Sequence, residues 1–224
     1  MQPQIKVVSV NIGQPQDIRL GRHHSLSGID KKPVPQRVQV GELGLEGDHI
    51  LSTKHHGGPD QAVYLYSEED YDAFAPILIE RGLGEVPAPG SFGENLTISG
   101  LESAGARIGT RLSIGTGQGA LVLEITAPRI PCATFAAHMG DANFVKVFRQ
   151  MRRPGLYARV IKAGTVRAGD PVNVQYGPDT APTVLEEFEL YYDALPSREA
   201  LKRSLAAPIA IRTRQGHLER LGKL

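Results

Sequence analysis

Short apolar runs rich in β-branched residues recur along the 224-residue chain, and each ends at Gly, Pro, Asn or Asp. Such runs, bounded by turn residues, are typical of β-strands. The predicted strands span residues 5–12, 36–40, 61–66, 94–98, 111–115, 121–126, 156–161 and 171–176. Short strands with long, irregular connections favour a closed or partly closed β-barrel over alternating strand and helix units.

Two helices are predicted as insertions in this barrel. Ser67 is a suitable N-cap for a helix over residues 68–81, with Asp70 at the capping-box position and Gly82 as the stop. The second helix is predicted over residues 135–151. Its apolar side chains recur at helical spacing: Phe144, Val147, Phe148 and Met151.

The pattern changes after Tyr176. Residues 177–182 are rich in Gly and Pro and are predicted to be a linker. Residues 183–224 are predicted to form a three-helix extension, with helices over 183–193, 197–205 and 208–221. A unit of about 45 residues is too small for a stable core of its own, so we expect it to pack on the barrel or on another subunit. The predicted organisation is a mixed β-barrel over residues 1–176, followed by this linker and this extension.

Composition narrows the function classes. The formal net charge is +1, so nothing in the balance of charges requires nucleic acid or an acidic membrane as partner. The chain has no apolar run approaching the ~18 residues of a membrane span. Its first ten residues lack the pattern of a signal peptide. With one cysteine in the chain, these features predict a cytoplasmic protein.

The single cysteine, Cys132, lies in the segment Ala127-Pro128-Arg129-Ile130-Pro131-Cys132. A strand-like run precedes the segment and a helix-like run follows it. The two prolines restrict the backbone, and a thiol at the start of a helix is favoured as thiolate. Cys132 is therefore a candidate nucleophile or metal ligand, although a free cysteine is also commonly a buried apolar residue.

Three further polar stretches lie where predicted strands meet loops: residues 44–49 (GLEGDH), 54–61 (KHHGGPDQ) and 91–96 (SFGENL). Each is also compatible with an ordinary solvated turn. Glycines let backbone amides approach a ligand closely, and polar loops on a rigid scaffold commonly form sites. No phosphate-binding loop, H-E-x-x-H or C-x-x-C motif occurs. Zinc bound by Cys132, His55, His56 and Asp48 would match no standard ligand spacing.

Taken together, residues 44–48, 54–62, 92–96 and 128–132 resemble the motifs of the MOSC domain. This domain occurs at the C-terminus of molybdenum cofactor sulfurases and in stand-alone bacterial proteins. The resemblance covers residues 5–176, and the helical extension is similar to one carried by the stand-alone branch. The resemblance implies a β-barrel fold. It also implies a reductase of N-hydroxylated nucleobases or amidoximes that uses the molybdenum cofactor and takes electrons from a separate flavoprotein.

The resemblance also implies roles for individual residues. Cys132 would be a thiolate ligand to molybdenum or would carry a persulfide, and a soft thiolate suits both roles. Arg129 or Lys54 would pair with the pterin phosphate, and His56 or Asp60 would deliver a proton to the substrate. His55 is an extra residue that the motif does not require. The remaining positions that match motifs around the cofactor cleft are Gly57, Gly58, Gly93, Glu94 and Asn95.

Two other functions stay open at this point. The protein would be a sulfur carrier if Cys132 received sulfur from a pyridoxal-phosphate-dependent cysteine desulfurase. Lys54 lies in a polar loop, which does not suit a pyridoxal-phosphate lysine in this chain itself. Alternatively, the barrel would bind a small anion without catalysis while the extension recruits a partner. The extension is also a candidate surface for a flavoprotein or for a homodimer.

Overall fold

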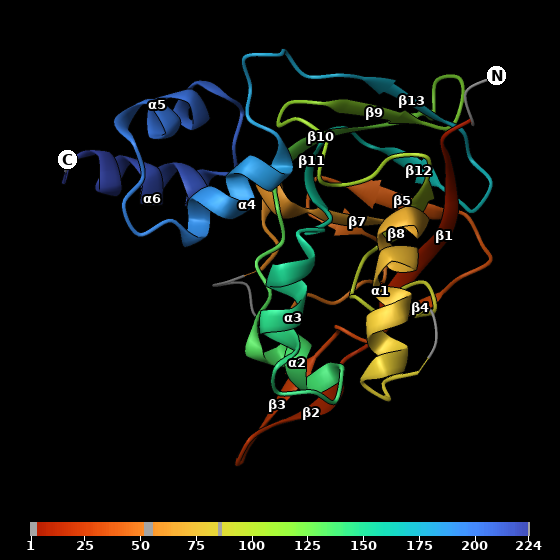
Figure 1. Ribbon diagram of the computed structural model, residues 1–224. Coiled ribbons are helices and arrows are strands. Elements are labelled where there is room, and N and C mark those ends of the chain that lie inside the picture. The colour runs from red at the N-terminus through yellow and green to blue at the C-terminus, as the bar shows by residue number, and fades with distance from the viewer. Residues whose placement is uncertain (1–3, 52–55, 85–86, 224) are drawn as a thin grey trace.

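The computed structural model describes residues 4–51, 56–84 and 87–223 (Figure 1). Its centre is an eight-stranded mixed sheet, in which all neighbours are antiparallel except β7 and β8. The strands, in their order across the sheet, are β13 (Val172–Gln175), β9 (Arg111–Ile114), β10 (Leu121–Ala127), β11 (Leu156–Lys162), β7 (Val63–Ser67), β8 (Leu96–Ser99), β1 (Lys6–Gly13) and β4 (Lys31–Pro33). The eight strands predicted from the sequence all have counterparts in the structure, seven of them in this sheet.

The sequence favoured a closed or partly closed β-barrel, and no closed barrel is found among the described strands. Strand β1 hydrogen-bonds to the segment before β13: the amide of Val7 donates to Asp170 O at 2.9 Å, and the amide of Gly169 donates to Val7 O at 2.8 Å. The other half of β1, from Asn11 to Gly13, pairs with β4 instead. Because the outer edge of β1 is divided in this way, the two ends of the sheet meet at one corner and stay apart along the rest.

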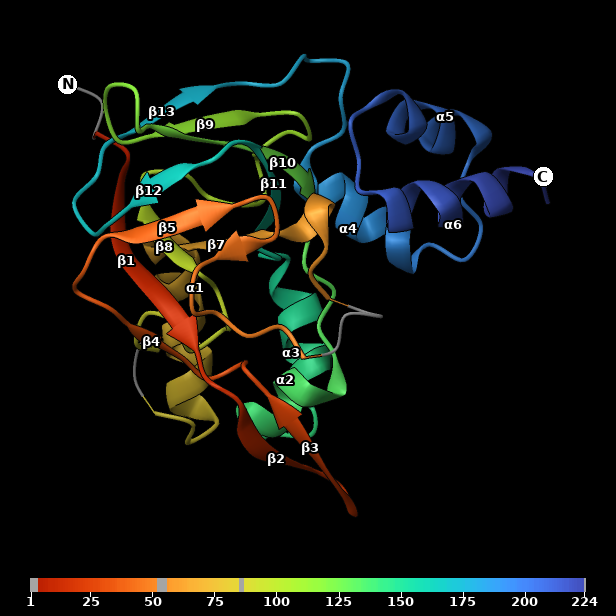
Figure 2. The same ribbon diagram turned by 180° about the vertical axis from the view of Figure 1, so that it is seen from behind.

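Two smaller sheets complete the β structure. The predicted strand at 36–40 corresponds to β5 (Val38–Gly41), which pairs with β12 (Gly164–Val166) and β6 (Gly44–Leu45). The hairpin of β2 (Gln16–Leu20) and β3 (His23–Ser27) was not predicted, since its residues are mostly polar and exposed. This hairpin extends from the end of the molecule that also carries α2 (Figures 1 and 2).

The first predicted helix is confirmed as α1 (Glu68–Glu80). Ser67 caps it as expected, because its hydroxyl accepts a hydrogen bond from the amide of Asp70 at 3.0 Å. Asp70 does not complete a capping box. Its buried carboxylate accepts hydrogen bonds from the amide of Ser103 and the guanidinium of Arg153, and so ties the helix to the rest of the chain.

The predicted single helix over 135–151 is wrong, because the structure has two short helices there. They are α2 (Ala133–His138) and α3 (Phe144–Met151). Gly140 lies between them with φ of +68°, a left-handed conformation that terminates the first helix and that glycine adopts at little cost. The break lets α2 and α3 pack against different sides of one aromatic cluster.

That aromatic cluster joins α1, α2 and α3 to the sheet. Phe92 is fully buried at its centre, and its ring lies 5.1–5.2 Å from the rings of Tyr66, Phe74 and Phe135, in edge-to-face arrangements. Such pairs stabilise a core beyond their buried area. The cluster therefore fixes the turn around Phe92 relative to the start of α2.

The C-terminal extension contains α4 (Val184–Tyr192), α5 (Arg198–Ala206) and α6 (Ile211–Leu221), on the opposite side of the molecule from β1 (Figures 1 and 2). Thr183 and Glu186 form a capping box at the start of α4. The predicted linker packs on the sheet: Ala181 is buried, and Pro182 O accepts a hydrogen bond from the amide of Ile108. No described helix has the length and apolar character needed to cross a lipid bilayer.

Replacing Phe92 with Ala tests the importance of the aromatic cluster. We expect Phe92→Ala to lower the free energy of unfolding by about 3–5 kcal/mol, because it leaves a cavity among fully buried rings. Urea denaturation followed by circular dichroism measures this loss. The control is Leu195→Ala at an 88% exposed residue, which should change stability by less than about 0.5 kcal/mol. Equal losses in both variants would contradict a cluster centred on Phe92.

Candidate functional site

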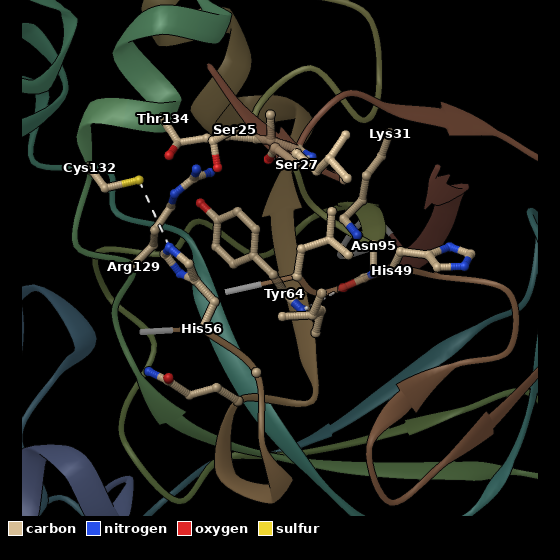
Figure 3. Close-up of a pocket in the computed structure, with 18 of the residues that line it drawn as sticks. Ser25, Ser27, Lys31, His49, His56, Tyr64, Asn95, Arg129, Cys132 and Thr134 are labelled. Carbon is tan, nitrogen blue, oxygen red and sulfur yellow. Dashed lines mark hydrogen bonds between the residues drawn. The ribbon is translucent and has the colours of Figure 1, made fainter. Parts of the chain in front are cut away.

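A cavity of about 270 Å³ lies beside the β2–β3 hairpin and is bounded by residues from segments far apart in the sequence (Figure 3). Its polar and charged lining side chains are Ser25, Ser27, Lys31, His49, His56, Gln61, Tyr64, Asn95, Arg129, Cys132, Thr134 and Tyr157. The structure thus brings residues of all four predicted polar stretches together at one cavity, the first stretch contributing only His49.

Cys132 occupies the strand-to-helix turn that the sequence predicted. Strand β10 ends at Ala127, the segment with Pro128 and Pro131 follows, and α2 begins at Ala133. Cys132 is the N-cap residue of α2 in an extended conformation, with φ of −129° and ψ of 172°. Its thiol is free and only partly buried, so it is available to the cavity.

His56 is the nearest polar partner of the thiol. Its Nε2 lies 3.9 Å from Cys132 Sγ, as the dashed line in Figure 3 shows. Burial opposes ionisation of the thiol, but the hydrogen bond with His56, the charge of Arg129 and the backbone at Phe135 outweigh it. They lower the pKa of Cys132 from 9.0 to about 7. A substantial fraction of Cys132 is therefore thiolate at neutral pH.

Arg129 is a buried cation beside this thiol. Its side chain donates a hydrogen bond to the carbonyl of Phe92, and its guanidinium lies 5.1 Å from the ring centre of Tyr64 and 4.0 Å from that of Phe135. Among the described residues no carboxylate forms an ion pair with it, and its Nε has no hydrogen-bond partner. A buried charge without a counter-ion is costly, so this part of the cavity favours an anion.

Lys31 supplies a second buried cation on the other side of the cavity. It forms an ion pair with Asp48, and both side chains are more than nine-tenths buried. Asp48 also accepts hydrogen bonds from Asn95 Nδ2 at 2.9 Å and from the amide of Gly13 at 2.8 Å. Burial lowers the pKa of Lys31, and Asp48 opposes that shift. The predicted site residue Asn95 is thereby fixed, since its Oδ1 also accepts from the amide of Tyr64.

Glycines allow the backbone to approach at two points of the cavity wall. A Cβ on Gly93, whose φ is +76°, would lie 3.1 Å from Ile29 and 3.8 Å from Arg129. A Cβ on Gly57, whose φ is +67°, would lie 2.9 Å from Ile50. Side chains at these positions would be strained and would crowd the cavity. Gly58 also has a positive φ but does not line the cavity; it precedes the short 3₁₀ helix at Pro59–Gln61.

Glu94 was expected near the cofactor cleft, but it is fully buried and does not line the cavity. Its carboxylate accepts hydrogen bonds from the Gly90 amide at 2.6 Å and from the hydroxyls of Tyr71 and Thr97 at 2.8 Å. Burial raises the pKa of Glu94, and these hydrogen bonds oppose the rise. Glu94 therefore holds the turn that presents Gly93, and its charge also opposes the lowering of the Lys31 pKa.

Asp60 was expected to be a proton donor, and the structure gives it a different role. Its Oδ2 accepts a hydrogen bond from the amide of Ile211 at 2.8 Å, and its Oδ1 lies 3.2 Å from Arg159 Nε. It therefore caps α6 from another segment, which Ala210 at the N-cap position cannot do itself. Asp60 connects the extension to the sheet and does not line the cavity.

Lys54 and His55 lie outside the described residues, so their predicted roles are not placed. Lys31 was missed by the sequence reasoning, since Asp30-Lys31-Lys32 looks like a solvated run of charges. Tyr64 and Tyr157 were missed because they read as ordinary strand residues. Among residues 4–51, 56–84 and 87–223, no group of three His, Cys, Asp or Glu side chains could hold a metal ion, which gives no support to a zinc site.

Comparisons with known proteins agree with this geometry. The family model for the MOSC domain matches residues 52–173, which is more than half of the chain. The chain belongs to the MOSC domain family. The matched region contains the loop with His56, the turn with Gly93 and the segment from Arg129 to Cys132.

Individual relatives extend the match beyond the family model. YflK of Bacillus subtilis is 32% identical over 168 residues, which cover 75% of this chain and 72% of YflK. The crystal structure of YiiM from Geobacillus stearothermophilus superposes with a TM-score of 0.76 at 26% identity, covering 97% of this chain and 99% of that one. A protein of Gibberella moniliformis named Reductase is 29% identical over 153 residues, which are 68% of this chain but only 26% of the fungal protein.

The thiol of Cys132 should titrate near neutral pH in metal-free protein. Because the thiolate is the reactive form, the rate of alkylation by iodoacetamide should rise with pH through a midpoint of about 7. His56→Ala removes the hydrogen bond and should shift this midpoint upward, toward the 9.0 of an ordinary thiol. His24→Ala, at an exposed histidine on the hairpin, is the control and should leave the midpoint unchanged. A wild-type midpoint near 9 would contradict the assigned environment.

Removing only one partner of the buried Lys31–Asp48 pair should destabilise the protein more than removing both charges. Asp48→Asn leaves the ammonium of Lys31 buried without a counter-ion, and we expect a loss of about 3–5 kcal/mol in the free energy of unfolding. Lys31→Met combined with Asp48→Asn removes both charges and should recover most of that loss. Urea denaturation measures both variants. A double variant less stable than the single one would show that the two charges do not act as a pair.

Proposed function

We propose that the protein is an oxidoreductase that binds the molybdenum cofactor and reduces N-hydroxylated compounds, such as nucleobases and amidoximes. Membership of the MOSC family and similarity to a fungal protein named Reductase support this class of activity. The observation that carries the proposal is the thiol of Cys132, with a pKa of about 7, in the wall of a cavity that contains two buried cations.

The residues of the cavity suit such a cofactor. A thiolate is a soft ligand for molybdenum, and a pKa of about 7 leaves Cys132 partly ionised at neutral pH without a bound metal. Arg129, which lacks a carboxylate partner among the described residues, suits an anionic pterin phosphate. Asn95 and the backbone at Gly57 and Gly93 would hydrogen-bond polar edges of the pterin. The cofactor, when bound, would supply the two-electron chemistry that side chains lack.

The protein's own residues would provide the proton and the dry surroundings. Reductive loss of water from an N–OH group consumes protons, and His56 lies 3.9 Å from the thiol with its ring in the cavity lining. These contacts favour His56 over Asp60 as the proton donor, because the carboxylate of Asp60 accepts a hydrogen bond from the start of α6. Ile29, Ile50 and residues of the β2–β3 hairpin line the cavity, and their apolar side chains would help to exclude water around a bound cofactor.

Electrons would come from a separate protein. No flavin or nicotinamide motif occurs in the sequence, so a flavoprotein reductase is the expected donor, and the substrate is a small molecule. The MOSC family also suggests sulfur transfer from a desulfurase to Cys132, but no observation in the cavity favours that function over the reductase.

Molybdenum content tests the proposal directly. Protein produced in a host that makes the cofactor should contain molybdenum in amounts approaching one atom per chain, measured by elemental analysis. Cys132→Ser should lose most of this metal while keeping the circular dichroism spectrum of the wild type, because a neutral hydroxyl is a poor soft-metal ligand. His24→Ala is the matched control and should retain the metal.

Two results would count against the reductase. Full molybdenum occupancy in Cys132→Ser would remove the ligand role of the thiol. A gain of one sulfur atom on Cys132, seen by intact mass after incubation with cysteine and a desulfurase, together with no molybdenum in wild-type protein, would favour the sulfur carrier.

A further inference from the structure

A second cavity, of about 800 Å³, lies between the sheet domain and the helical extension. One wall includes Pro128 and residues 130–134, and the other includes residues of α4 and α6. Five residues line this cavity as well as the first one: His56, Gln61, Cys132, Thr134 and Tyr157. The thiol and His56 therefore stand at the boundary between two cavities, and the extension contributes to only one of them.

The extension places a buried carboxylate in the wall of this second cavity. Glu187 of α4 is 2% exposed and His217 of α6 is 4% exposed, and both line the cavity. His217 Nε2 lies 3.2 Å from Glu187 Oε2. Glu187 Oε1 is also buried but has no hydrogen-bond partner among the described residues. A buried carboxylate oxygen without a donor is costly, and a ligand that offers an N–H group would remove that cost.

The two arginines that join the walls of the cavity already donate hydrogen bonds within the protein. Arg212 of α6 donates to Gly57 O at 3.1 Å and to Gln61 Oε1 at 2.8 Å. Arg220 donates to the carbonyls of Leu190 and Asp193, and so joins α6 to the end of α4. These arginines connect segments of the protein, whereas Glu187 lines the cavity with one buried carboxylate oxygen whose hydrogen-bonding capacity is unused among the described residues.

Gly216 of α6 faces the same cavity. A Cβ built on this residue would meet no atom within 4 Å, and its backbone is not in the left-handed region. Glycine inside a helix costs about 1 kcal/mol relative to alanine, so no local reason favours it here. Its effect is to leave this part of the cavity wall without a side chain. The rings of Tyr157 and Tyr191 add flat apolar surface for a planar ligand.

We propose that the second cavity is the substrate site, and that Glu187 selects planar nitrogen compounds that present N–H donors, such as an amidine or an amino-substituted ring. That this ligand is a substrate rests on the reductase function proposed above, whereas binding of the ligand in the second cavity does not depend on that function. Such a ligand would satisfy Oε1 of Glu187 with a charge-assisted hydrogen bond while its reacting nitrogen lies toward Cys132 and His56. Carboxylates would be repelled by Glu187.

Benzamidine is a suitable probe, because it is planar, cationic and the product expected from reduction of benzamidoxime. Isothermal titration calorimetry on metal-free protein should show binding of benzamidine and at least about tenfold weaker binding of benzamide and benzoate. Glu187→Gln should weaken benzamidine binding by about tenfold or more. Glu189→Gln, at an exposed neighbour on α4 that pairs with Arg152, is the control and should bind as the wild type does.

A second pair of variants separates loss of the ligand site from loss of the fold. Gly216→Leu should fill the cavity and abolish benzamidine binding, whereas Gly216→Ala should preserve binding and raise the free energy of unfolding slightly. Bound benzamidine should also slow alkylation of Cys132 by iodoacetamide, because the thiol lines the same cavity. Unchanged binding in both Glu187→Gln and Gly216→Leu, or tighter binding of benzoate than of benzamidine, would overturn the proposal.

These outcomes can be told apart from failure of the reductase function. Benzamidine binding that depends on Glu187, in protein that never acquires molybdenum, would support the ligand site and refute the reductase. Molybdenum-dependent reduction of benzamidoxime with the same KM in Glu187→Gln as in the wild type would support the reductase and overturn the role of Glu187.

Discussion

The buried guanidinium of Arg129 connects the three parts of the molecule that form the site. It donates to the Phe92 carbonyl, lies 4.0 Å from the ring centre of Phe135 in α2 and contacts Tyr64 of β7. A desolvated cation over aromatic rings gains about 2 kcal/mol per contact, which offsets only part of the cost of burying the charge. The neighbouring thiol of Cys132, when it is ionised, supplies negative charge that offsets the rest of this cost. Burial opposes ionisation of the Arg129 side chain, but Tyr64, Tyr157 and Cys132 raise its pKa, and Arg129 in turn helps to lower that of Cys132. Packing of the aromatic cluster and ionisation of the thiol are therefore coupled.

The division of β1 between two neighbours explains where the first cavity lies. Its second half pairs with β4, and the chain between these strands forms the β2–β3 hairpin at the cavity rim. Close backbone contacts pack this region: a Cβ on Gly13 would lie 2.0 Å from Gly28 O, and one on Gly28 would lie 2.2 Å from His49 O. Only glycine permits such approaches. The same region brings Lys31, in the cavity wall, together with Asp48, so polar residues line the cavity beside the β1–β4 end of the sheet.

Local patterns predicted the strands, α1 and the thiol at the start of α2, because each depends on residues that are close in sequence. Closure of the sheet depends on which segments pair with the outer edge of β1, and no local sequence pattern predicts that pairing. Glu94 and Asp60 match the family motifs, yet their carboxylates are used inside the fold: one holds a turn, and the other caps α6. Lys31 shows the opposite case, since a lysine in a charged run becomes a buried cation only through its long-range partner Asp48. Motif matching thus found the right segments, while the role of each side chain depended on tertiary contacts.

The contacts of the extension indicate that it is part of the site. It is too small for an independent core, and it is fixed through the loop that carries His56: Ile211 donates to Asp60, and Arg212 donates to Gly57 O. Helix α6 therefore helps to position the loop whose histidine ring lies 3.9 Å from the thiol. The same helix carries His217 and Gly216 into the wall of the second cavity. Because one helix both positions the histidine and shapes the neighbouring cavity, a ligand held by the extension would be placed relative to Cys132 by direct packing, without a separate conformational change.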